Sequence, residues 1–406
     1  MGRGVVWGLY ALILALAPLV FTSSLSHTLL SQMGIAIIVC LSYNILLGQG
    51  GMLSFGHAVY SGMGAFLAIH TLRLVSGGLA LPVSLIPLVG GLASLALALL
   101  LGWVTTKKAA TPFAMITLGI GELVWAMALM FPGFFGGEAG LSGNRVAGSP
   151  LLGITFGPQI ELYYLIALYT LVCTALMYAF TRTPLGRMLN AVRDNPERAA
   201  FVGYNPQMVR YLAFVIAAFF AGISGGLAAL NFEIVTSEVL SGHRSGAYLL
   251  FTFLGGTTFF FGPIIGAILM VLAFVLLSGL TQAWLLYLGL IFIVMVTLAP
   301  GGVASLVMLN LRRVRGGGWR RLWPVYGILL VTGSLALSGA AALLEMLYHL
   351  QLGAALGPEL PFFGVTLNIE TWGHWLGAGA VLLFGLMLFE LSRRKLMQHG
   401  QGGERT

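Results

Sequence analysis

The chain has 406 residues, of which 58% are hydrophobic and 8% are charged, and its mean hydropathy is +0.96. This balance excludes a soluble globular domain. The net charge of +8 would fit nucleic-acid binding in a soluble protein, but in so apolar a chain it reflects the positive-inside bias of membrane proteins. The two cysteines, Cys40 and Cys173, each lie within an apolar run, which argues against a disulfide framework or a metal site.

Apolar runs long enough to cross a bilayer core of about 30 Å recur along the chain. They are continuous rather than alternating, which favours helices over a closed barrel. We therefore predict an all-α polytopic transmembrane bundle of about ten core spans and two C-terminal spans. The first span could be read as a signal peptide after Arg3, but further spans follow at once, so we expect an uncleaved helix. The expected spans are 5–21, 29–48, 53–72, 81–104, 112–131, 160–181, 207–230, 246–260, 264–279, 284–299, 323–344 and 372–391.

Positive residues indicate the orientation of these spans. If the N-terminus is cytoplasmic, 17 of the 20 Lys and Arg residues lie on the cytoplasmic side, and only Arg73, Arg145 and Arg244 lie outside. The cytoplasmic groups include the segment 183–206 and the arginine cluster at 312–321. Both termini are therefore predicted to be cytoplasmic.

The same count resolves the run 246–279, which has 34 residues. As one crossing it would place the 312–321 cluster outside, whereas a break within it restores the parity. Gly and Pro are natural break points, and short interrupted helices often line transport sites. The expected break residues are Gly255, Gly256, Gly262 and Pro263.

Composition changes after Pro300, which divides the chain into parts. We expect a transmembrane core over 1–300, a basic Gly/Arg-rich cytoplasmic linker over 301–322, a two-helix membrane appendix over 323–395 with a long loop at 345–371, and a cytoplasmic tail over 396–406.

A dense cluster of glycine and polar residues lies between Asn44 and Phe66, where the sequence reads NILLGQGGMLSFGHAVYSGMGAF. Close helix packing explains small residues in lipid. A broken helix whose freed backbone groups line a transport pathway is the alternative, and it fits the cluster as a whole better. The candidate pathway residues are Asn44, Gln49, Ser54, His57 and Tyr60.

Glu122 lies in the middle of the span 112–131. An ionisable side chain at this depth is costly, so it should face a polar interior or have a partner. Contact with a substrate ammonium group and a satisfied structural carboxylate both explain it. We count it among the candidate pathway residues. The spans contain no second charge that would form an obvious proton relay, which weakens a proton-coupled mechanism.

The sequence contains no Walker-type phosphate loop, no His/Cys/Asp/Glu cluster with metal-ligand spacing and no visible nucleophile–base arrangement. Gly316–Gly318 is flanked by arginines rather than by a strand and a helix, so it is interpreted as a linker. We expect neither an enzyme site nor a cofactor bound by this chain, and any ATP hydrolysis would occur on another chain.

The segment 183–206 is a polar, basic island between two apolar runs. Asn195 is a good helix N-cap and Pro196 suits the first helical position, so a short helix is expected from there to Gly203. A solvated loop or a lipid-headgroup anchor is the simpler explanation. The length of the segment and its capped-helix pattern favour docking to another protein.

Three motifs resemble those of the permease subunits of ABC importers for branched-chain amino acids, the LivM type. They are SYNILLGQGGMLSFGHAVYSGMGAF at 42–66, TPFAMITLGIGELV with GGEAGLSG at 111–124 and 136–143, and TPLGRMLNAVRDNPERAAFVGYNPQMVRYLAFVIAAFFAGISGGL at 183–227, followed by FLGGTTFFFGPIIGA at 253–267. The resemblance covers roughly residues 40–300.

The resemblance implies a heteromeric, ATP-driven importer in a bacterial inner membrane. This chain would pair with a second permease subunit, bind two cytoplasmic ATPase subunits and receive substrate from a periplasmic binding protein. The segment 183–206 would then be the coupling loop. By resemblance, its ATPase-facing residues are Gly186, Arg187, Arg193, Asp194, Asn195, Glu197, Ala199, Ala200 and Gly203.

The appendix at 323–395 lies outside the family pattern, and related permeases also transport urea, amides or small aromatic acids. Two other classes compete with the importer: a stand-alone secondary carrier or channel, and an assembly protein of the membrane. A carrier should show paired membrane charges or an inverted repeat, and neither is visible. An assembly protein has no need of a segment like 183–206.

Overall fold

The structure, a computed structural model, describes residues 3–146, 155–281, 283–299, 301–315, 319–352, 358–362 and 365–401. The chain forms two compact units. Unit 1 contains Met1–Leu276 with Ile291–Leu306, and unit 2 contains Leu277–Leu290 with the chain from Val307 onward. These units, rather than a single boundary near residue 300, describe how the chain packs.

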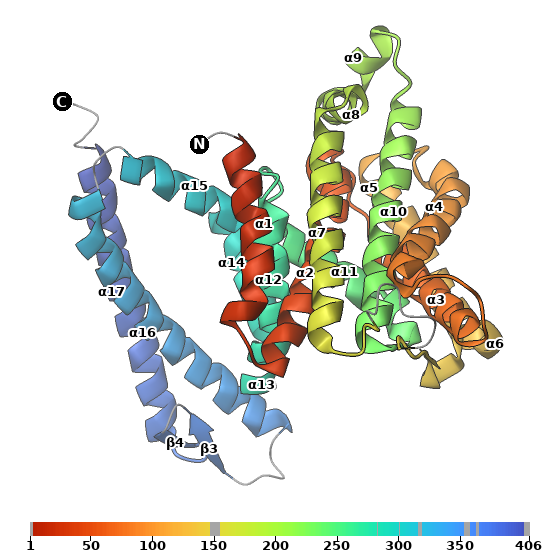
Figure 1. The fold of residues 1–406 in the computed structure, drawn as a ribbon. Coiled ribbons are helices and arrows are strands. Elements are labelled where there is room, and N and C mark those ends of the chain that lie inside the picture. The colour runs from red at the N-terminus through yellow and green to blue at the C-terminus, as the bar shows by residue number, and fades with distance from the viewer. Residues whose placement is uncertain are drawn as a thin grey trace. The chain divides into compact units, whose positions relative to one another are not determined.

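Helices account for nearly all of the described chain (Figure 1). In chain order the long helices are α1 (Arg3–Val20), α2 (Ser24–Asn44), α3 (His57–Ser76), α4 (Ile86–Thr105), α5 (Ala110–Met130), α7 (Gln159–Arg182), α8 (Pro184–Asp194), α10 (Pro206–Phe232), α11 (Gly242–Gly255), α12 (Gly262–Leu272), α14 (Trp284–Leu298), α15 (Gly302–Arg315), α16 (Trp319–Leu352) and α17 (Trp372–Gln401). The short helical elements are η1 (Ile45–Gln49), η2 (Val83–Leu85), α6 (Pro132–Phe135), η3 (Gly137–Ala139), α9 (Pro196–Phe201), η4 (Ser237–Leu240), η5 (Ala273–Leu277) and α13 (Ser278–Leu280).

Nine helices in the described residues are long and apolar enough to cross a membrane, or ten if the bent pair of α14 and α15 is one span. The prediction of a polytopic helical bundle is therefore confirmed. Each of the twelve expected spans corresponds to a helix, but three of these helices, α1, α11 and α14, are not among the nine that are long and apolar enough by themselves. Gly4–Val20 is one of these short apolar segments, and α11 has only 14 residues.

The core of unit 1 is a close contact among α3, α4 and α10, made possible by small residues. A Cβ added to Gly90 of α4 would lie 2.7 Å from the carbonyl oxygen of Gly64 in α3. A Cβ on Gly64 or Gly225 would overlap the backbone of Gly222 or Ser61, respectively. Backbones that approach this closely gain dispersion contacts, which drive helix association in lipid where the hydrophobic effect cannot.

α11 and α12 form an antiparallel pair around the predicted break. α11 ends at Gly255, Gly256 follows with φ +111°, and α12 begins at Gly262 with Pro263 in its first turn. A Cβ on Gly255 would lie 2.7 Å from the amide nitrogen of Gly266, so the two helices touch through their backbones. The interruption therefore lies at the glycine and proline residues that the sequence pointed to.

The end of unit 1 opposite to α8 and α9 is built from ordered connections (Figure 1). The two-residue strands β1 (Leu141–Ser142) and β2 (Ile234–Val235) pair antiparallel, with Leu141 opposite Val235. Arg145 fastens this end, because its guanidinium donates to the carbonyl oxygens of Phe156 at 2.8 Å and Gly157 at 3.0 Å. Residues 147–154 of the loop between α5 and α7 lie outside the described residues.

The main part of unit 2 is an antiparallel pair of long helices, α16 and α17, with a hairpin between them. Gly339 of α16 lies against Leu382 of α17, and Gly385 lies against Ala336. Strands β3 (Glu359–Phe362) and β4 (Val365–Asn368) form the hairpin. Glu345 of α16 accepts hydrogen bonds from the hydroxyl groups of Thr281 and Tyr287.

The structure differs from the sequence-based organisation in two places. Residues 302–315 of the expected linker form helix α15, because no Gly or Pro interrupts the sequence until residue 316. The run Gly316–Gly318 itself lies outside the described residues. The expected loop 345–371 is partly helix and partly the β3–β4 hairpin, since α16 continues to Leu352.

Candidate functional site

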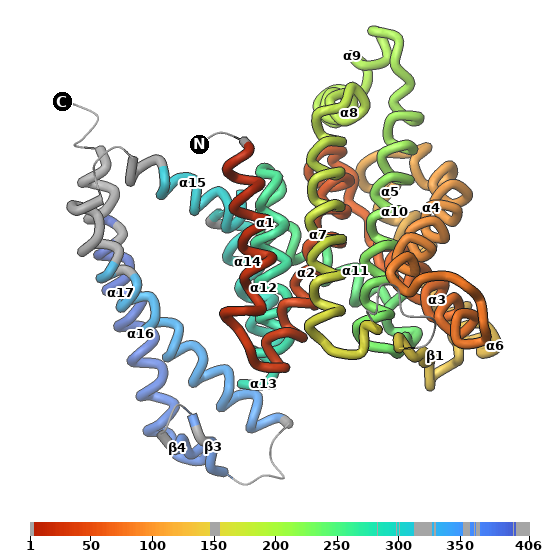
Figure 2. The backbone as a smooth tube through the Cα atoms, in the orientation of Figure 1, coloured from red at the N-terminus to blue at the C-terminus, as the bar shows by residue number. Residues whose placement is uncertain are grey.

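The segment 183–206 forms two short helices, α8 and α9, each with its own N-cap. The Thr183 hydroxyl accepts from the Gly186 amide at 3.2 Å, and the Asn195 side chain accepts from the Arg198 amide at 2.8 Å. Pro184 and Pro196 occupy first helical positions, where the missing N–H costs nothing. The chain path from α7 through α8 and α9 into α10 can be followed in Figure 2.

α9 projects from the end of the bundle (Figure 1), and exposed apolar residues lie where it ends. Phe201 is 91% exposed and Val202 is 71% exposed, whereas Ala199 faces inward and is 6% exposed. Gly203 has φ +94° and ends the helix. Exposed apolar groups at the end of a polar segment are typical of a docking surface.

The remaining ATPase-facing candidates divide between the surface and the bundle. Arg187, Asp194, Asn195, Glu197 and Ala200 are exposed. Gly186 is buried, and a Cβ there would overlap the carbonyl of Phe180.

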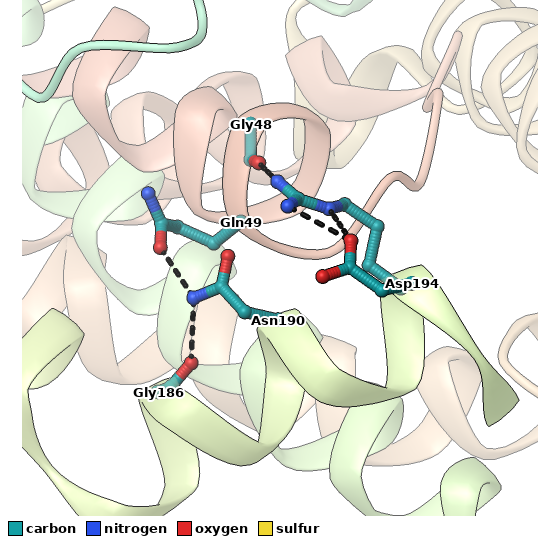
Figure 3. Close-up of polar contacts among 6 residues, drawn as sticks. Gly48, Gln49, Gly186, Asn190 and Asp194 are labelled. Carbon is teal, nitrogen blue, oxygen red and sulfur yellow. Dashed lines mark hydrogen bonds and ion pairs between the residues drawn. The ribbon is translucent and has the colours of Figure 1, made fainter. Parts of the chain in front are cut away.

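α8 is fastened to η1, the π-helical turn that ends α2. The Arg193 guanidinium donates to the carbonyl oxygen of Gly48 at 2.5 Å and pairs with Asp194 at 3.0 Å. The Asn190 amide donates to Gln49 Oε1 at 2.8 Å and to the Gly186 carbonyl at 3.0 Å (Figure 3). Two side chains of α8 thus hold two consecutive residues of the π-helical end of the α2 span.

Asn190 was missed by sequence analysis, although a signal was available. It lies three residues before Arg193, so both side chains emerge from one face of α8. That face also carries the buried Leu189, whose Cδ1 would lie 3.2 Å from a Cβ on Gly50. The face of α8 that the sequence assigned to a partner therefore partly faces the bundle.

Two interruptions of the helical bundle meet at Gly48. A Cβ on Gly48 would lie 2.6 Å from the carbonyl oxygen of Thr257, in the break between α11 and α12. The Asn44 amide oxygen would also overlap a Cβ on Gly48. This oxygen is buried and has no hydrogen-bond partner among the described residues. Gly256, in the same break, lies against Gly301 and Gly302.

The pathway candidates Ser54 and His57 are completely buried. His57 Nε2 lies 2.9 Å from the Ser42 hydroxyl, and the ring packs edge-on against Tyr43 at 5.0 Å. The Tyr43 hydroxyl donates to the Ser54 carbonyl at 2.7 Å. Together these contacts hold the non-helical stretch between η1 and α3 against α2.

Of the other two pathway candidates, Tyr60 adjoins that cluster, with its ring centroid 6.5 Å from that of His57, whereas Glu122 lies apart from it. Tyr60 is 2% exposed and packs edge-on against Phe214 at 5.2 Å. Glu122 is exposed on α5, and its Oε1 would lie 2.8 Å from a Cβ on Gly242 at the start of α11. A carboxylate in that position is favourable, because the N-terminal end of a helix carries partial positive charge.

A cavity of about 280 Å³ lies among α2, α3, α10, α11 and α12. Its walls include Ile35 and Val39 of α2 and Val271 of α12, and its polar groups include Arg244 and Tyr248 of α11. None of the six pathway candidates lines this cavity, although Ser61 and Gly62 of the same motif do. We refer to it as the central cavity.

α2 connects the central cavity with the contact between α8 and η1. Its middle part forms one wall of the central cavity, and its C-terminal extension η1 is held by α8. π-helical turns are frequent at functional sites, because they mark places where the regular hydrogen-bond ladder is broken. The same helix therefore carries both the contact with α8 and part of the cavity wall.

A polytopic helical bundle with a cavity among its helices, and with a pair of capped helices fastened to the π-helical end of one span, fits the class of membrane permeases. The chain belongs to the family described as the branched-chain amino acid transport system / permease component, whose model matches residues 26–299. The match begins within α2 and ends after α14, so it leaves α1, α15, α16 and α17 outside the family pattern.

Two curated relatives are similar over most of this region. The high-affinity branched-chain amino acid transport system permease protein LivM of Escherichia coli (strain K12) is 27% identical over 303 residues, which is 70% of each chain. The protein of the same name from Salmonella typhimurium (strain LT2) is 28% identical over 304 residues, again 70% of each chain. No solved structure matches the chain.

Proposed function

We propose that this chain is one of two transmembrane subunits of an ATP-driven importer for branched-chain amino acids. Family membership and the names of the relatives support the substrate class. The observation that supports ATP-driven coupling is the fastening of α8 to η1 through Arg193 and Asn190. The absence of a phosphate-binding motif from the sequence supports ATP hydrolysis on a separate chain.

In this proposal two cytoplasmic ATPase subunits complete the complex, one on each permease subunit. α9 and its exposed Phe201 dock into a groove on one ATPase subunit. ATP binding closes the ATPase dimer and displaces α9 and α8. Because α8 holds Gly48 and Gln49, the displacement passes into η1 and α2, and it changes which side of the membrane the central cavity faces.

The other end of unit 1 receives substrate from a periplasmic binding protein. The chain lies in the inner membrane with both termini in the cytoplasm. The charge count from the sequence supports this orientation. In Figure 1 the N-terminal end of α1 and the α8–α9 pair also lie toward the same end of unit 1.

Reconstitution tests the proposal. The permease pair, the ATPase subunits and the binding protein encoded alongside this chain are placed in proteoliposomes, and uptake of radiolabelled leucine is measured. We expect uptake that requires both ATP and the binding protein. Urea, small amides and benzoate serve as competitors, and we expect none of them to compete at concentrations that saturate leucine.

Two controls make the result decisive. A non-hydrolysable ATP analogue should support no net uptake. Uptake driven by an ion gradient without nucleotide would overturn the proposal, because it would identify a secondary carrier. Uptake of an amide or aromatic acid in preference to leucine would overturn the substrate class only.

A further inference from the structure

One cationic side chain, that of Arg244, lines the central cavity and has no anionic partner among the described residues. Arg244 lies in the first turn of α11 and is half-buried, and its backbone amide donates to the Ser241 hydroxyl at 3.3 Å. Its guanidinium makes no hydrogen bond or ion pair with any described residue, and it lines the cavity. Burying a guanidinium without a partner is costly, so this position favours binding of an anion.

A second donor lies one helical turn away. Tyr248 lines the same cavity, and its hydroxyl oxygen accepts from the Ser61 hydroxyl at 3.5 Å. Its own proton has no acceptor among the described residues and can be donated to a bound group. Residues four apart lie on the same face of a helix, so Arg244 and Tyr248 point into the same space.

The opposite walls of the cavity are apolar. Ile35 and Val39 come from α2, Val239 comes from η4, and Val271 comes from α12. At about 280 Å³ the cavity is slightly smaller than the ~300–1,000 Å³ of pockets for drug-sized ligands. It therefore suits a small solute with one anionic end and one aliphatic end.

We propose that the central cavity binds the amino acid during transport, with the substrate carboxylate on Arg244 and Tyr248 and the branched side chain against α2 and α12. A guanidinium matches a carboxylate in bidentate geometry, which makes this pair strong and orients the ligand. The inference rests on the proposed function and deepens it. It assigns substrate contact to residues outside the six pathway candidates.

The position of the central cavity fits a binding site on the transport route. Its α2 residues lie in the middle of that helix, whereas Phe232 ends α10 at the side away from α8 and α9. The site therefore extends from mid-membrane toward the end where the binding protein would deliver substrate. Glu122, near the start of α11, adds a negative charge outside the cavity for an arriving ammonium group.

A cysteine-protection assay on the assembled complex tests the site without relying on uptake. Val239→Cys places a thiol in the cavity wall, and the native Cys40 and Cys173 are buried at 0% and 2% exposure, so their labelling is slow. We expect leucine to slow labelling of this thiol by a polar maleimide. Leucinamide, which keeps the side chain and lacks the carboxylate, should not protect.

Arg244→Gln should weaken protection by leucine at least about ten-fold, as expected for loss of a charge-assisted contact. Arg244→Lys should keep part of the protection, because the charge remains without the bidentate geometry. Arg73→Gln is the matched control: Arg73 is predicted to lie on the same membrane side, and its side chain donates to the Ser142 carbonyl at 2.8 Å, away from the cavity. It should leave protection unchanged.

Three outcomes would overturn the inference while leaving the proposed function intact. They are equal protection by leucine and leucinamide, full protection in the Arg244→Gln variant, and no protection in a complex that transports leucine normally. Failure of the unsubstituted complex to transport leucine would instead count against the proposed function. Co-purification of each variant with its partner subunits excludes loss of folding as the cause.

Discussion

Arg193 of α8 donates a hydrogen bond to the backbone carbonyl of Gly48, the fourth residue of η1. A charged side chain from the polar segment thereby holds a main-chain atom at the π-helical end of a membrane span. Gly51 leaves the space for it, because a Cβ there would lie 2.7 Å from Arg193 Cγ. Four predictions follow from this relationship and from the packing around it.

Replacement of Arg193 should reduce transport without reducing binding of the ATPase subunits. In Arg193→Ala the link to Gly48 is lost, while the exposed apolar end of α9 remains. A charge-assisted hydrogen bond contributes about 1.5–3 kcal/mol, so we expect uptake to fall about ten-fold or more. The ATPase subunits should co-purify as before. Lys108→Ala, at an exposed position, is the control and should transport normally.

Asn190 and Gln49 should be energetically coupled. We expect a double-mutant cycle of Asn190→Ala and Gln49→Ala to give a coupling energy of about 0.5–1.5 kcal/mol from thermal unfolding of the purified permease. Gln49→Ala combined with Tyr169→Phe, which removes the bond to the Ser84 carbonyl, should be additive. Additivity in the first pair as well would contradict the contact.

Phe201 should be the main apolar contact for the ATPase subunit. It is 91% exposed, and burying a phenylalanine contributes about 1.5–3 kcal/mol. In Phe201→Ser we expect at least about a ten-fold loss of ATPase association, measured by co-purification and by binding in detergent. Phe131→Ser, at a 54% exposed residue just after α5, should have no effect. Lipid-headgroup anchoring would instead leave association intact in both variants.

Small residues in the core of unit 1 should be required for stability. Gly225→Ala places a methyl group on the Ser61 carbonyl, and overpacking of this kind costs about 1–3 kcal/mol. Its melting temperature should fall clearly. Gly119→Ala on α5 has nothing within 4 Å of the added Cβ and should melt at or above the temperature of the unsubstituted protein. Similar melting of the two variants would rule out this packing argument.

Much of the helical organisation could be predicted, because each crossing must satisfy its own backbone hydrogen bonds in a continuous apolar run. The expected spans 29–48, 160–181 and 207–230 lie within α2–η1, α7 and α10. The cap formed by Asn195 and Pro196 could also be predicted, since capping depends only on neighbouring residues. Helix α15 was expected as a linker, because a basic composition resembles that of a loop even where nothing interrupts a helix.

The residues that line the cavity could not be predicted from local sequence patterns. Polar residues at membrane depth indicated a special region between Asn44 and Tyr60, but His57 and Ser54 lie in a packed cluster with Tyr43. The cavity instead takes residues from five helices far apart in sequence. Arg244, at the start of α11, lines that cavity, but the sequence analysis used it only as one of three positive residues on the outer side.

Length, apolarity and charge bias can be read along the chain without any knowledge of packing, and they were enough to predict a polytopic helical membrane protein with a polar segment between two spans. The packing of the helices brings Asn190 and Arg193 of that segment onto Gln49 and Gly48, and α2 joins this contact to a cavity lined by Arg244. No local pattern records these contacts, because they join residues about 140 positions apart and depend on how small residues let the helices pack.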